Sequence, residues 1–195
     1  MKKYQREIIK LTSKEILLSL FDITTPFLEA DRAYRQSIKS YLRKREYDKA
    51  NFFVKLRYWQ RQGYINTFLE GKEKFIELTP KGKTHLENLA FEEINIKRPQ
   101  KWDGKWRIVI FDIPEKNRAS RDTLRAKLLT LGFRQIQKSV YVYPFECTKE
   151  IFELSDRLDV KKSVLIMIAE IIQGENRIVK FFLNRDILNN SDLKN

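Results

Sequence analysis

The chain has 195 residues, enough for one large domain or two small ones, and its 42% hydrophobic content is too high for a disordered protein. Its 39 lysines and arginines outnumber 26 acidic residues, and the net charge of +13 favours a polyanionic partner, most often nucleic acid. The single cysteine, Cys147, excludes an intrachain disulfide, and one histidine is too few for a thiolate or imidazole metal cluster. No segment has the apolar length of a membrane-spanning helix or a signal core, so we expect a cytoplasmic protein without a membrane partner.

Helix patterns dominate the first sixty residues. Ser13 can cap a helix over 14–21, and Pro26 suits the first position of a second helix that extends to about Tyr41. A basic stripe on this second helix faces either a phosphate backbone or plain solvent. Its members are Arg32, Arg35, Lys39 and Arg43.

A third helix is expected over 49–62, with Asp48 as its N-cap and Gly63 at its C-terminal end. Phe52, Leu56 and Trp59 recur at spacings of three and four, which predicts that they face a core.

Two strands over 64–69 and 74–78, joined by a turn at 70–73, form a predicted hairpin, and a helix then extends from Thr79 toward Phe91. The order of three helices, hairpin and helix resembles the winged-helix families of bacterial transcription regulators. The resemblance includes the phrases Gly-Tyr-Ile before the hairpin and Leu-Thr-Pro-Lys-Gly after it.

This resemblance implies double-stranded DNA as the partner, with the third helix in the major groove and the hairpin along the phosphates. Residues 1–100 hold 21 basic and 13 acidic residues, a net charge of +8, which favours DNA over the alternative of a protein-interaction module. Asn51 and Lys55 are the candidate base-reading residues. The candidate phosphate contacts are Arg43, Lys44, Arg45, Lys49, Arg57, Arg61, Lys72 and Lys74.

The pattern breaks near residue 100, where we place the boundary between a winged helix-turn-helix DNA-binding domain (1–100) and a dimerisation domain (101–195). Trp102 and Trp106 are candidates to pack the two domains together. The second domain is expected to be α+β and ferredoxin-like, in β-α-β-β-α-β order with one extra strand. Its expected elements are a strand at 106–111, a helix at 118–131, strands at 133–137 and 139–143, a helix at 149–158, a strand at 164–172 and the extra strand at 178–183.

Residues 106–145 resemble the central domain of the PaaX family of repressors. The matching phrases are Trp-Arg-Ile-Val-Ile-Phe-Asp-Ile-Pro-Glu, Leu-Arg-x-Lys-Leu-x-x-Leu-Gly-Phe and Ser-Val-Tyr-Val-Tyr-Pro. A winged helix precedes this domain in that family, so the resemblance implies a homodimeric transcription repressor on a palindromic operator. One apolar face of the sheet is expected to pack on a second copy. The sequence does not identify a small-molecule effector.

The same domain is similar to the small CRISPR-associated endonuclease of spacer adaptation, through Phe111-Asp112-Ile113 and Gln-Lys-Ser-Val-Tyr at 137–141. This resemblance implies an alternative: a Mg²⁺-dependent nuclease or an adaptation scaffold with Asp112 as its metal-binding and catalytic residue. A loop role for Asp112, in which it accepts backbone N–H bonds, is the simpler interpretation, because only Glu115 lies near it as a second carboxylate. We therefore expect no catalytic residue and no cofactor in the leading hypothesis.

Two further polar residues are weighed. His85 has no partner ligand in the sequence and is expected on a helix surface or cap. Cys147 precedes a helix, where a thiolate would be favoured, but no catalytic base accompanies it.

Overall fold

The computed structural model describes residues 17, 35–43, 49–170 and 172–193. The chain divides into two compact units, Met1–Glu93 and Ile94–Asn195. The second unit begins before residue 100, because Ile94 and Trp102 are buried in it. None of the helices in the described segments is long and apolar enough to cross a membrane.

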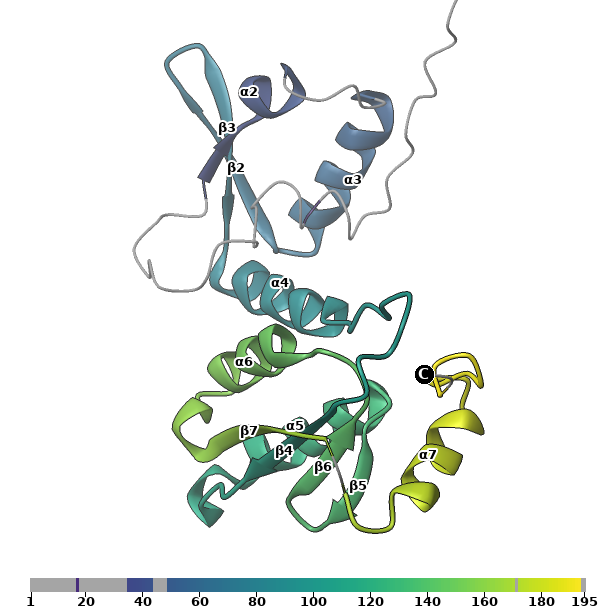
Figure 1. Ribbon diagram of the computed structural model, residues 1–195. Coiled ribbons are helices and arrows are strands. Elements are labelled where there is room, and N and C mark those ends of the chain that lie inside the picture. The colour runs from purple at the N-terminus through teal and green to yellow at the C-terminus, as the bar shows by residue number, and fades with distance from the viewer. Residues whose placement is uncertain (1–16, 18–34, 44–48, 171, 194–195) are drawn as a thin grey trace, which may run out of the picture. The chain divides into compact units, whose positions relative to one another are not determined.

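The first unit combines a three-stranded antiparallel sheet with helices (Figure 1). Its strand order is β1-β3-β2, and the β2–β3 hairpin turns at Gly71, which has a φ of 60°. Its elements are β1 (Arg35–Ser37), α2 (Ile38–Arg43), α3 (Lys49–Arg61), β2 (Ile65–Glu70), β3 (Glu73–Leu78) and α4 (Pro80–Glu93).

The predicted second helix is wrong at residues 35–37, which form strand β1. Arg35 lies opposite Glu77 and Ser37 opposite Phe75, so β1 covers one edge of β3. The helix begins only at Ile38, and the basic stripe is therefore broken at Arg35. Of the expected helix over 14–21, only Leu17 lies within the described residues.

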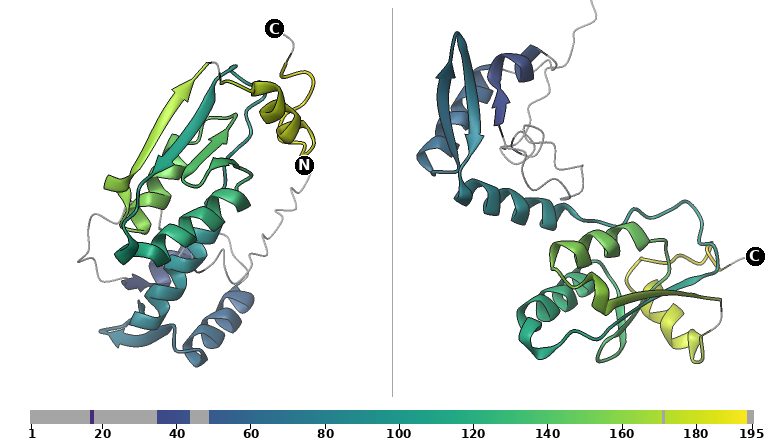
Figure 2. Two further views of the ribbon diagram at one scale, coloured as in Figure 1. Left: turned by 90° about the horizontal axis from the view of Figure 1, so that it is seen from below. Right: turned by 90° about the vertical axis from the view of Figure 1, so that its left-hand side faces the viewer.

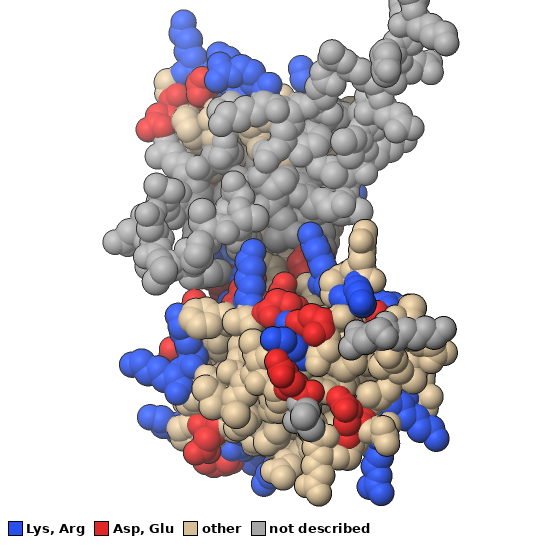
Figure 3. All heavy atoms as spheres, viewed as in Figure 1, with Lys and Arg blue, Asp and Glu red and all other residues tan. Residues whose placement is uncertain are grey.

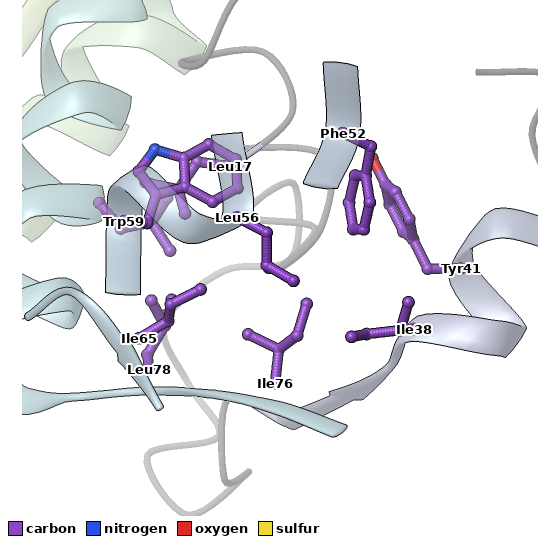
Figure 4. Packing of buried hydrophobic residues seen from close by; sticks show 10 residues of the cluster. Leu17, Ile38, Tyr41, Phe52, Leu56, Trp59, Ile65, Ile76 and Leu78 are labelled. Atoms are coloured by element: carbon purple, nitrogen blue, oxygen red, sulfur yellow. The ribbon is translucent and has the colours of Figure 1, made fainter. Parts of the chain in front are cut away.

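The core of the first unit lies between the sheet and α3 (Figure 4). Tyr41 of α2 stacks on Phe52 of α3 with 5.5 Å between ring centroids. Leu17 joins this cluster at 1% exposure, so a residue of the N-terminal segment packs beneath α3. The labelled residues are Leu17, Ile38, Tyr41, Phe52, Leu56, Trp59, Ile65, Ile76 and Leu78.

The second unit has the expected β-α-β-β-α-β order. Its four-stranded antiparallel sheet has the order β5-β6-β4-β7, and α5 and α6 cover one of its faces (Figures 1 and 2). The elements are β4 (Trp106–Phe111), η1 (Glu115–Asn117), α5 (Arg118–Thr130), β5 (Arg134–Gln137), β6 (Val140–Tyr143), α6 (Thr148–Arg157), η2 (Lys161–Ser163), β7 (Val164–Ala169) and α7 (Glu175–Leu183).

The expected extra strand at 178–183 is wrong, because these residues belong to helix α7. Phe182 of this helix is fully buried and stacks on Trp106, with 5.8 Å between the ring centroids. Trp106 in turn contacts Trp102 at 4.7 Å. The two tryptophans therefore pack within the second unit, which corrects their expected role between domains.

Candidate nucleic-acid interface

Helix α3 has one buried apolar face, and its other positions form a basic face in which the exposed Phe53, Val54 and Tyr58 lie among the cations. Phe52, Leu56 and Trp59 are buried at 1%, 4% and 2% exposure, as their spacing predicts. The remaining positions carry four cations and no acidic residue. Lys49, Arg57 and Arg61 are exposed and Lys55 is half-buried.

The C-terminal end of α3 is fixed by Gly63. The N–H of Gly63 donates to Gln60 O at 3.1 Å, and the N–H of Tyr64 donates to Trp59 O at 3.0 Å. This pair of bonds is a Schellman motif, which requires a left-handed residue after the helix, and Gly63 has a φ of 72°. The chain therefore turns directly from α3 into strand β2.

Residues at the start of α4 donate hydrogen bonds to the backbone of this junction. Thr79 Oγ1 donates to Gly63 O at 2.6 Å, and Lys81 Nζ donates to Gln62 O at 2.9 Å. The Tyr64 carbonyl accepts the Thr79 N–H at 3.0 Å and lies so close to Gly82 that a Cβ there would come within 1.8 Å of it. The segment Leu-Thr-Pro-Lys-Gly thus fixes the orientation of α3 relative to the β2–β3 hairpin.

The tip of the hairpin keeps the two lysines that the sequence interpretation assigns to phosphate contacts. Lys72 and Lys74 are exposed, as expected of phosphate contacts. Glu73 lies between them in sequence but is turned toward the unit, where it accepts a hydrogen bond from Ser37 at 3.1 Å and pairs with Lys39 at 3.9 Å.

Of the remaining predicted DNA contacts, some lie among the described residues and others lie outside them. Arg43 is exposed at the end of α2, whereas Lys44, Arg45 and the expected cap Asp48 lie outside the described residues. Asn51 is half-buried on α3. The structure therefore gathers the candidates of α3 on one helix, with those of the hairpin in the same unit.

A buried arginine organises the start of the second unit. Arg107 donates to both carboxylate oxygens of Asp103 at 2.7 Å, to Glu146 at 3.0 Å and to two backbone carbonyls. Hydrogen bonds from Arg107 lower the pKa of Asp103. The pKa of Glu146 is lowered first by hydrogen bonds from Thr148 and then by Arg107. This cluster satisfies a cation that is only 5% exposed, and we assign it a structural role.

Asp112 follows β4 and is exposed. The expected acceptor role is wrong for the part of the chain that the structure covers. There, no group donates to its carboxylate, and its own N–H donates to Ser163 O at 3.0 Å. Glu115, the nearest second carboxylate in sequence, pairs with Arg121 at 2.8 Å and Arg118 at 3.6 Å. No group of three or more metal-ligating side chains occurs among the described residues. Within one chain, the described residues therefore offer a single free carboxylate here, fewer than a Mg²⁺ site needs.

Cys147 and His85 are both packed against neighbours. Burial raises the pKa of the Cys147 thiol to about 12, which corrects the expectation of a favoured thiolate before α6. His85 stacks on Tyr64 with 4.2 Å between ring centroids and supports the junction after α3.

Comparison with known proteins bears on the second unit. Residues 99–178 match the family model of the PaaX protein central Cas2-like domain, which confirms the resemblance expected from the sequence. A solved structure of an uncharacterized protein from Mycobacterium tuberculosis is 15% identical, with a TM-score of 0.34 over 88% of this chain and 67% of that one. No curated protein matches the chain.

Proposed function

With the PaaX central domain at residues 99–178 as the premise, we propose that the chain is a DNA-binding transcription regulator that acts as a homodimeric repressor. In this proposal the first unit is a winged helix-turn-helix. Helix α3 enters the major groove of double-stranded DNA, and the β2–β3 hairpin is the wing that follows the phosphates.

The basic face of α3 carries the proposal. Within the described segments, no carboxylate forms an ion pair with Lys49, Lys55, Arg57 or Arg61. Four cations on thirteen residues repel one another, and a phosphate backbone alongside would offset that repulsion. Burial of the apolar face and the close contacts at Gly63 and Gly82 hold the basic face in a fixed position within the first unit.

Base reading falls to Asn51 and Lys55, whose side chains can pair with adenine and guanine edges respectively. Arg43, Lys49, Arg57, Arg61, Lys72 and Lys74 would hold phosphates, together with Lys44 and Arg45.

The homodimer is proposed through strand β7, which is an edge of its sheet. Leu165 and Met167 of β7 are 57% and 47% exposed, and they lie opposite Ile110 and Ile108 on the sheet face that α5 does not cover. Antiparallel pairing with a second copy would place Lys162, before the strand, near Glu170 of the other copy. The edge would therefore be self-complementary in charge.

Salt-dependent DNA binding tests the regulator. Fluorescence anisotropy of the full chain with a duplex of about 40 base pairs is expected to give affinity that falls steeply with salt, by a slope of about −0.9 per phosphate contacted. Neutralising two contacts with Arg57→Gln and Arg61→Gln should reduce that slope by about 2. The matched control, Lys116→Gln with Lys149→Gln, changes the net charge equally on exposed residues of the second unit. Equal losses in both variants, or no salt dependence, would refute the basic face as the DNA contact.

Operator selection from a random duplex library tests the repressor. We expect enriched sites with two half-sites related by a two-fold axis. Asn51→Ala should relax the preference at one base position by about 1–3 kcal/mol. Light scattering tests the dimer separately, because Met167→Glu should convert it to a monomer if β7 is the interface.

A further inference from the structure

The arginines of the second unit differ in their partners. Six of its nine arginines form ion pairs with carboxylates at 2.7 to 3.6 Å, and three have no such partner among the described residues. The paired ones are Arg98, Arg107, Arg118, Arg121, Arg125 and Arg157. The three others, Arg134, Arg177 and Arg185, all lie at α7 or beside it.

Two of these three arginines lie over one aromatic ring, and the third offers its backbone carbonyl to one of them. The guanidinium carbon of Arg185 lies 4.5 Å from the centroid of the Phe181 ring, and that of Arg134 lies 5.1 Å from it. Arg134 also donates a hydrogen bond to Arg177 O. The ring and the helix backbone thus hold two guanidinium groups close together, although like charges repel.

Helix α7 adds a fourth cation to this corner. Ile178 and Phe182 are buried at 5% and 0% exposure, whereas Arg177, Lys180 and Arg185 are exposed on the outward side of the helix and its C-terminal end. Figure 3 shows cationic side chains that project at the corner where Figure 1 draws α7.

The acidic residues of α7 and its end do not neutralise these cations. Glu175 accepts a hydrogen bond from Trp106 Nε1 at 2.6 Å, so it is turned toward the sheet. Asp186 forms no ion pair with any residue that the structure describes. The corner therefore carries four cations against the exposed carboxylate of Asp186 and the hydrogen-bonded carboxylate of Glu175.

We propose that this corner, formed by Arg134, Arg177, Lys180 and Arg185, is a second phosphate-binding surface, which contacts the DNA backbone outside the segment read by α3. The proposal rests on the regulator function above. Arg177 and Lys180 are three residues apart in α7, a rise of about 4.5 Å, and Arg185 follows just beyond the end of the helix, so the cations can contact neighbouring phosphates of one strand. Guanidinium groups held over a ring are suited to bidentate phosphate contacts, and such contacts add affinity without sequence preference.

The test compares three variants of the full chain on the same duplex of about 40 base pairs, with anisotropy measured over a series of salt concentrations. The α7 variant carries Arg177→Gln, Lys180→Gln and Arg185→Gln, and leaves Arg134 in its contact with the Arg177 carbonyl. We expect its affinity at low salt to fall about tenfold and its salt slope to decrease by about 2 to 3. The charge-matched control is Lys116→Gln, Lys149→Gln and Lys101→Gln, which removes three exposed lysines of the same unit and should keep most of the parent slope. The α3 variant, Arg57→Gln with Arg61→Gln, reports on the regulator function itself.

The outcomes separate the two proposals. If the α3 variant loses affinity while the α7 variant keeps the parent affinity and slope, the α7 surface is refuted and the regulator proposal stands. If the parent chain binds no duplex, both fail. Equal losses of affinity and salt slope in the α7 variant and its control would show that net charge causes the effect, and the proposed α7 surface would be refuted. Tighter binding of single-stranded RNA through the same three residues would also overturn it.

Discussion

Substitution of Gly82 by alanine probes the contacts at the start of α4 that fix the orientation of α3 relative to the hairpin. The added Cβ would lie 1.8 Å from the Tyr64 carbonyl oxygen and 2.7 Å from its carbon, and both atoms belong to the backbone. A tolerable contact of 3.0 Å requires the start of α4 to move by 1.2 Å. That displacement strains or breaks the hydrogen bonds that Thr79 makes to Gly63 and Tyr64.

The cost follows from these contacts. Two weakened hydrogen bonds contribute about 1 kcal/mol each, and the overpacked contact contributes about 1 kcal/mol or more. We therefore expect Gly82→Ala to lower the free energy of unfolding of the first unit by about 3 kcal/mol. Such a loss corresponds to opening that is about 100-fold more frequent.

Hydrogen exchange followed by mass spectrometry measures this opening directly. Amides of α3 and β2 should exchange about 100-fold faster in the variant, while amides of the second unit, which has its own core, serve as the internal reference. Asn88→Ala, on an exposed position of the same helix, is the control and should change these rates by less than about threefold. An equally small change in Gly82→Ala would show that the close approach is not a constraint, and the reasoning would be wrong.

Three further predictions follow from single groups. Because the pKa values of Asp103 and Glu146 are lowered in the folded state, their stabilisation is present above the unfolded values near pH 4 and is lost as pH falls through the folded values. The urea midpoint of the second unit should therefore fall below about pH 4, and Asp103→Asn should flatten that decline. With its pKa raised to about 12, Cys147 should resist a disulfide reagent at pH 8 in the native protein and react at once in concentrated urea; rapid native reaction would contradict its burial. Gly63→Ala should cost about 1 kcal/mol in urea unfolding, because φ is 72° there although the space is open, and a neutral result would count against the Schellman motif.

Much of the second unit could be predicted because its signals are local. The apolar run 106–111 and the spacing of Leu124 and Leu128 each agree with the element that forms. The segment 178–183 misled because Ile-Val-Lys-Phe-Phe-Leu suits both a strand and a helix, and burial of Phe182 against Trp106 decides in favour of the helix. Strand β1 was missed because three residues have no periodicity and are held only by pairing with β3.

The candidate site was predictable to a similar degree. The cations of α3 follow from a helical pattern with no acidic residue. The corner at α7 does not, because a strand interpretation of 178–183 leaves Arg177 outside the element and conceals its alignment with Lys180. The pairing of the other arginines is partly local, since Arg118 and Arg157 pair with carboxylates three or four residues away, whereas Arg98 pairs with the distant Asp192.

The uncharged edge strand β7 makes the isolated chain prone to aggregation. Six consecutive apolar residues, Val164 to Ala169, form one margin of the sheet, where their outer backbone donors and acceptors pair with no other strand that the structure describes. Such a margin templates amyloid-like stacking as readily as an ordered contact. Lys161, Lys162 and Glu170 flank it as gatekeepers, so charge neutralisation at these three positions should promote precipitation during concentration long before it affects folding.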